Sequence, residues 1–214
     1  MAKDILHCIA DRGEVVAFLA ALPEDPERDR LAAEYRRLSA AYEQVGRRAN
    51  ALAPRLDASV DDLIDATGKR REALLAEYVS LSTELDALPR LRSAMARKFA
   101  HALNAWVRHV RPQVVQEHDR RAADAVQLTR DLAPYGALVE RFDQSPTLRA
   151  VNQQQYDEAW RELARLRPCV ARQQEARQVV DLIDMTTTKY FGSATPPNGA
   201  TIDRFVSATA RPAA

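Results

Sequence analysis

Apolar residues recur at alternating spacings of four and three through the first half of this 214-residue chain. The clearest run comprises Leu31, Tyr35, Leu38, Tyr42, Val45, Ala49 and Leu52. One apolar residue every 3.5 positions forms the a/d seam of a coiled coil. Asp25 followed by Pro26 is typical of a helix start, because aspartate caps the first N–H groups and proline suits the first helical position. Pro54 is expected to end this helix.

A second run of the same kind follows residues 54–58, which we expect to be a short link. It passes through Val60 and Ile64, weakens near Gly68, and is strongest at its end, which comprises Leu74, Tyr78, Leu81, Leu85 and Leu88. Two such helices joined by a short connection predict an antiparallel hairpin over about residues 26–88.

The next stretch, residues 87–116, contains no Asp or Glu and six bases, which are Arg90, Arg92, Arg97, Lys98, Arg108 and Arg111. On a helical wheel Arg90, Arg97, His101 and Arg108 share one face, whereas Phe99 and Trp106 lie on the other. The preceding residues, 57–86, hold eight acids and three bases, a net charge of −5. We expect the acidic and basic blocks to pair, within a bundle or between subunits.

Prolines and glycines predict where helices begin, bend or end in the remaining sequence. Pro112 is expected to kink or interrupt the basic helix, and residues 134–136 to form a turn. Ser145-Pro146 predicts a further helix start, in a segment whose buried residues should include Trp160. Pro168 marks another break, before a last helix over residues 169–184.

The composition changes after Met185, where Thr, Ala, Pro and Gly become frequent. We therefore predict an all-α fold in which residues 1–185 complete the hairpin into an elongated helix bundle, and an extended or disordered tail over residues 186–214. Ile202, Phe205 and Val206 have the spacing of one helical turn and could form a docking motif in that tail.

Composition narrows the class of protein further. Only 6 glycines occur, which favours long helices, and the net charge is +1, which gives no bulk attraction to nucleic acid. Cys8 and Cys169 lack metal-binding spacing, so neither a metal nor another cofactor is expected. The charged N-terminus does not resemble a secretion signal. We expect a protein of the cytoplasm, or of a particle assembled there.

One dipeptide, His118-Asp119, raises the question of catalysis. Metal-dependent phosphohydrolases of the HD type use an adjacent His-Asp pair on an all-α fold. Here Gln116-Glu117 precede the pair and Arg120-Arg121 follow it, whereas a metal-binding pair needs apolar support to orient it. We therefore expect a protein that is not an enzyme.

Three interpretations of the basic helix remain open. Its arginine face could be solvated or paired with acids, contact nucleic-acid phosphates through Arg90, Arg97, His101, Arg108 and Arg111, or lie on an anionic membrane. The membrane ranks last, because the flanking heptads should already occupy the apolar face. The leading hypothesis is a structural or assembly protein that binds copies of itself or another protein, for example as a subunit of a virion or secretion machine. The alternative is a nucleic-acid-associated regulator.

Overall fold

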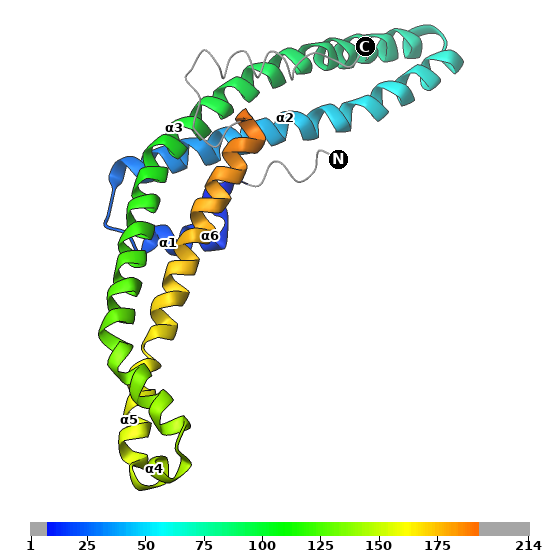
Figure 1. The fold of residues 1–214 in the computed structure, drawn as a ribbon. Helices are drawn as coiled ribbons and strands as arrows, with labels where there is room; N and C mark the ends of the chain where they lie inside the picture. The colour runs from blue at the N-terminus through cyan, green and yellow to red at the C-terminus, as the bar shows by residue number, and fades with distance from the viewer. Residues whose placement is uncertain (1–7, 193–214) are drawn as a thin grey trace. The chain divides into compact units, whose positions relative to one another are not determined.

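The computed structural model describes residues 8–192, and these form an all-α helical bundle with no strand in that range (Figure 1). The predicted fold class is confirmed. The elements are η1 (Ile9–Asp11), α1 (Gly13–Ala20), α2 (Pro26–Asp65), α3 (Gly68–Asp143), α4 (Pro146–Val151), α5 (Gln153–Leu163) and α6 (Leu166–Phe191). None of the helices in the described range has the length and apolar character needed to cross a bilayer.

Two compact units divide the chain. The first contains the described residues 8–12, 24–109 and 186–192, and the second contains residues 13–23 and 110–185. Both α3 and α6 therefore contribute to each unit. The hairpin of α2 and the first half of α3 belongs to the first unit.

The hairpin turns at Ala66-Thr67, between α2 and α3. Gly68 follows with a φ of +56°, a left-handed conformation that glycine adopts without steric cost. The link predicted at residues 54–58 is wrong, because α2 continues through it. The residue in the sequence that marks the true turn is Gly68, near which the apolar pattern weakens.

The seam of α2 also keeps its register past Pro54. After Leu52 the inward positions are those spaced four and three further on, which comprise Leu56, Ser59, Leu63 and Ala66. Val60 and Ile64, predicted in the seam, are instead 41% and 76% exposed.

The other predicted seam residues do lie inside the hairpin. Val45, Leu52, Leu81 and Leu88 form one core cluster, with Leu85 packed against it. Leu31, Tyr35 and Leu38 are buried at the start of α2. The partly buried members are Tyr42, Leu74 and Tyr78.

Four prolines lie inside long helices without ending them: Pro54 in α2, and Pro89, Pro112 and Pro134 in α3. The predicted turn at residues 134–136 and the interruption at Pro112 are therefore wrong. All four prolines are exposed. Each one leaves the carbonyl four residues earlier without its helical donor, and because the proline itself faces outward, the lost hydrogen bond does not disturb the packed face. The inward face keeps its packing.

The last helices also differ in detail from the prediction. α4 begins at Pro146 as expected, but Trp160 in α5 is 47% exposed rather than buried. α6 starts before Pro168 and runs to Phe191, so residues 186–191 are helical and not part of an extended tail. The remaining tail, with Ile202, Phe205 and Val206, lies outside the described residues.

Arg121 connects three helices of the second unit. Its guanidinium lies 4.9 Å from the ring centroid of Phe18 in α1, and its Nη1 donates to the carbonyl oxygen of Arg172 in α6 at 2.9 Å. Within α3, its Nε donates to Glu117 at 2.7 Å. Because one rigid guanidinium satisfies all these contacts, Arg121 fixes the three helices together.

Glu117 is held by two arginines. Hydrogen bonds from Arg120 and Arg121 lower the pKa of Glu117 to about 2, against the opposing effect of partial burial. A carboxyl whose pKa is lower in the folded than in the unfolded state stabilises the fold above the unfolded pKa, and this contribution disappears as the pH falls toward the folded pKa.

We predict that Pro54→Ala stabilises the chain by about 1–2 kcal/mol, because it restores one helical hydrogen bond in a continuous helix. Urea unfolding followed by circular dichroism measures the change. Pro26→Ala is the matched control, since a proline at the first helical position costs no hydrogen bond and its replacement should give no gain. If Pro54→Ala destabilised the chain, the proline would be required for a local bend.

We further predict that Glu117→Gln destabilises the fold by about 2 kcal/mol at pH 7, and that this difference shrinks as the pH is lowered from about 4.5 to about 2. Urea unfolding of both proteins across this pH range gives the comparison. Glu158→Gln, at an exposed position of α5, serves as the control. A destabilisation of equal size at pH 2.5 and pH 7 would mean that packing, not charge, is lost.

Candidate protein-interaction surface

The two edges of the hairpin differ in chemistry. With the seam residues at a and d, the g positions of the antiparallel helices meet along one edge and the e positions along the other. On the g edge, Arg48 donates to Glu84 from Nε at 2.6 Å and from Nη2 at 2.8 Å. Further toward the turn, Nη2 of Arg55 lies 3.4 Å from Oε1 of Glu77. We call this side the charged edge.

The hydrogen bonds that Arg48 donates lower the pKa of Glu84 below its ordinary value, and the Glu84 carboxylate that accepts them raises the pKa of Arg48. Both side chains are exposed, so such a pair contributes little to stability. Its main effect is to fix which residues of α2 and α3 lie opposite one another.

The opposite side carries large apolar side chains that no described residue covers. Val60 and Leu75 occupy e positions, and Ile64 and Val79 occupy the neighbouring b positions. They are 41%, 53%, 76% and 55% exposed, in that order. We call these four residues the apolar edge. Such a cluster near one end of a hairpin is typical of an interaction surface.

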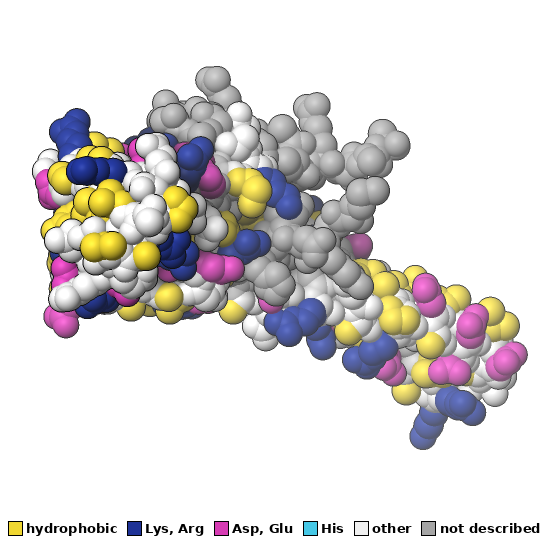
Figure 2. All heavy atoms as spheres, turned by 60° about the horizontal axis from the view of Figure 1, so that its bottom comes forward, with side chains coloured by type: hydrophobic (Ala, Val, Ile, Leu, Met, Phe, Trp, Pro, Cys, Tyr) yellow, Lys and Arg dark blue, Asp and Glu magenta, His cyan; other side chains and the backbone are white. Residues whose placement is uncertain are grey.

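Acidic residues border the apolar edge. Asp57 in α2 and Glu72 and Asp86 in α3 are exposed, and all three occupy b positions. Among the described residues none of them has an ion-pair partner. At the right of Figure 2, hydrophobic side chains lie among acidic ones, with Lys and Arg side chains beside them. Any contact made through the apolar edge would have to leave these carboxylates solvated at its rim.

The other end of the hairpin is held by an aromatic cluster. The ring of Tyr35 lies 5.3 Å from Phe99 and 6.1 Å from Trp106, and Phe99 also contacts Tyr190 of α6 at 5.7 Å between centroids. Burial raises the pKa values of Tyr35 and Tyr190 well above the ordinary value. The cluster joins α2, α3 and the end of α6.

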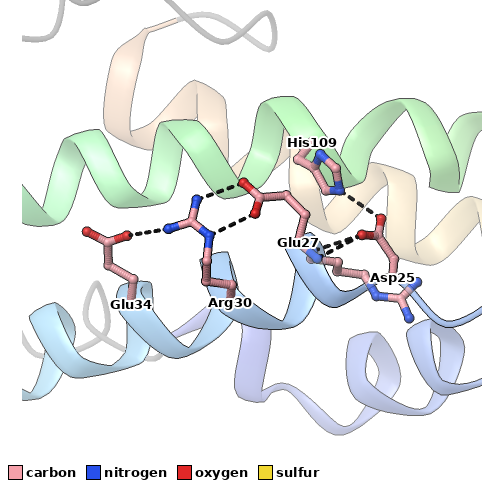
Figure 3. A network of polar contacts seen from close by, with 6 residues as sticks. Asp25, Glu27, Arg30, Glu34 and His109 are labelled. Atoms are coloured by element: carbon pink, nitrogen blue, oxygen red, sulfur yellow. Dashed lines mark hydrogen bonds and ion pairs between the residues drawn. The ribbon is translucent and has the colours of Figure 1, made fainter.

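Several residues of the basic stretch are engaged in structural contacts. His109 Nε2 lies 2.7 Å from Asp25, whose carboxylate also accepts the backbone N–H groups of Glu27 and Arg28 (Figure 3). Arg111 forms a bidentate pair with Asp184 at 2.6 and 2.9 Å. The predicted contact residue Arg111 is therefore already bound to a carboxylate of α6.

Among the described residues, the ion pairs of Glu77, Glu84 and Arg111 do not join residues 57–86 to residues 87–116 within the chain, and the pairing between subunits stays a prediction. Glu77 and Glu84 pair with arginines of α2, and Arg111 pairs with α6. Arg92, at an a position of α3, lies over the ring of Tyr42 at 5.5 Å from its centroid. The cation thus occupies a seam position by covering an aromatic face.

The other predicted contact residues are exposed. Arg90 and Arg97 have no charged partner among the described residues. Arg108 is exposed as well, and His101 lines a groove of about 580 Å³ together with Arg37, Lys98 and Glu34. This groove lies at the base of the charged edge.

The possible catalytic residues are not assembled into a site. His118 Nδ1 lies 3.0 Å from its neighbour Asp119, whose side chain is largely exposed. In the described part of the chain, no group of three or more His, Cys, Asp or Glu side chains is placed to hold a metal ion. Burial raises the pKa of Cys8 to about 12, so this thiol stays protonated.

Comparisons with known proteins find no relative of this chain. No family model matches the sequence, no curated protein matches it, and no solved structure matches the fold. The class that the structure defines is an all-α bundle with a coiled-coil hairpin.

Proposed function

We propose that this protein is a non-enzymatic structural or assembly protein, which associates with copies of itself through the hairpin. The observation that carries the proposal is the apolar edge. Its four large apolar side chains are 41% to 76% exposed to water, although burying them would be favourable. They lie on two helices rather than on a loop, as expected for an interaction surface.

Self-association fits the design of the hairpin. An apolar edge on a two-helix coil is the surface that a second hairpin would cover to complete a four-helix arrangement. Burying a Val or Leu side chain stabilises a contact by about 1 kcal/mol or more. In a symmetric contact both copies contribute the same four side chains, so the gain is counted once for each copy. A subunit of a larger particle, such as a virion or a secretion machine, would use such contacts repeatedly.

A second candidate function is binding to nucleic acid. It is favoured by the exposed guanidinium groups of Arg90 and Arg97, which have no charged partner among residues 8–192. They lie seven residues apart, or about 10 Å along α3, so both could reach phosphates of one nucleic-acid backbone.

To test self-association, we predict that the paired substitution Leu75→Glu with Val79→Glu weakens it at least tenfold, about 1.4 kcal/mol, because charges would be buried at the contact. Light scattering on the full chain over a range of concentrations measures the mass. Ala73→Glu is the matched control, since this exposed position lies about 120° or more around the same helix from both Leu75 and Val79. A full chain that is monomeric at every concentration would contradict the proposal.

For the nucleic-acid alternative, we predict that Arg90→Glu with Arg97→Glu weakens binding to a labelled oligonucleotide at least tenfold at low salt. The affinity of the unmodified chain should fall as salt rises, because phosphate contacts release counterions. Fluorescence anisotropy gives both numbers. Arg55→Glu with Arg70→Glu, two exposed positions outside residues 87–116, lowers the net charge by the same four units and is the control. An unmodified chain that does not bind at low salt would eliminate this alternative.

A further inference from the structure

The groove at the base of the charged edge exposes part of the seam between α2 and α3. Its floor is formed by three d positions, which are Leu38, Met95 and Ala102. Closer to the turn of the hairpin, arginine and glutamate side chains at g positions bond to each other across the seam. At the groove two g positions are alanine instead, Ala41 and Ala105, and a methyl group is too short to bridge the two helices. The groove, of about 580 Å³, is therefore open to side chains from outside.

Positive charge borders this groove. Arg37 of α2 and Lys98 of α3 line it and are exposed, and neither has a charged partner among the described residues. His101 lines the groove as well. The acidic lining residue, Glu34, lies 3.7 Å from Arg30 of its own helix. The groove thus combines an apolar floor with cations at its rim.

The apolar edge has a rim of the opposite sign. Within residues 57–64 and 68–86, the b and e positions of the hairpin carry three acids and no base. The neighbouring bases Lys69, Arg70 and Arg71 occupy the f, g and a positions. A symmetric contact between two apolar edges would bring together three carboxylates from each copy, and like charges placed side by side oppose association. The groove offers cations at the same place.

The shapes of the two surfaces also fit. Leu75 and Val79 lie four residues apart on α3, and side chains with this spacing form a ridge that packs between the side chains of another helix. Val60 and Ile64 have the same spacing on α2. A volume of about 580 Å³ lies within the range of clefts that hold a small molecule, so the groove has room for a pair of aliphatic side chains.

Both surfaces of one copy can be occupied at the same time. They lie on opposite edges of the hairpin, and Val79 is about 28 Å from Lys98 along α3 at 1.5 Å per residue. One neighbour cannot cover both edges, so each copy would contact two different neighbours. Head-to-tail contacts of this kind form rings or open filaments.

We infer that the apolar edge of one copy docks in the groove of a second copy. Leu75 and Val79 then lie on the apolar floor, and the acids of the edge lie beside Arg37 and Lys98. These charges stay solvated at the rim, where they set the orientation of the two copies more than the affinity. The inference rests on the proposed self-association and names the surface that receives the apolar edge.

Two variants, each of which disables one surface, test this arrangement. The groove variant combines Arg37→Glu with Lys98→Glu, and the edge variant combines Leu75→Glu with Val79→Glu. We expect the unmodified chain to grow past two copies in light scattering as its concentration rises. Each variant alone should associate at least tenfold more weakly. All four positions are exposed, so the helices should persist, which circular dichroism checks.

Mixing the two variants separates a head-to-tail contact from a symmetric one. The groove variant keeps its apolar edge and the edge variant keeps its groove, so a pair of unlike chains can form one intact contact. We expect a species of two copies, and none larger, at concentrations where neither variant associates alone. Arg90→Glu with Arg97→Glu makes the same change of charge outside the groove and should associate like the unmodified chain.

The results that contradict the two proposals differ. If the groove variant associates as strongly as the unmodified chain, or if the mixture stays monomeric, the inference is overturned and self-association stands. If the unmodified chain is monomeric at every concentration, the proposed function fails and the inference fails with it.

Discussion

The first unit depends on one constraint, which is the unbroken 3.5-residue register between α2 and α3. Every seam position from Leu31 to Ala66 follows from it, although Pro54 interrupts the hydrogen bonding of the backbone. Side-chain interdigitation over many turns outweighs a single proline when the proline faces water. The same register assigns the ion pairs to one edge and the exposed apolar residues to the other. The surface chemistry is therefore a consequence of the packing inside.

The sequence predicted the helices better than their ends. The 4–3 spacing correctly indicated an all-α hairpin, because the pattern reports directly on which residues face inward. Pro54, Pro112 and residues 134–136 were misleading, since the effect of a proline depends on which face it occupies. Continuing the spacing from Leu52 would have placed Leu56 and Ser59 inward and left Val60 outside. The apolar edge was thus present in the sequence but was hidden by the wrong register.

Contacts between distant residues could not be predicted in the same way. Periodicity identifies the face that a residue occupies but not the residue opposite, so the pairing of Arg111 with Asp184 and of His109 with Asp25 had no local signal. The contact of the exposed Arg92 with the ring of Tyr42 had no local signal either. The basic stretch proved to be a mixture of structural and solvent-facing cations.

The order in which the chain visits its two units has a consequence for any attempt to divide it. The described chain passes from the first unit to the second at Gly13, returns at Glu24, leaves again at Val110 and comes back at Thr186. Neither unit is therefore a contiguous piece of sequence, and no single cut separates them. A fragment made by removing either terminus loses part of the first unit, and the two units should not be inherited or exchanged as independent modules. The first unit takes residues from both ends of the chain, and the shortest continuous piece that contains the second unit whole, residues 13–185, also carries most of the first.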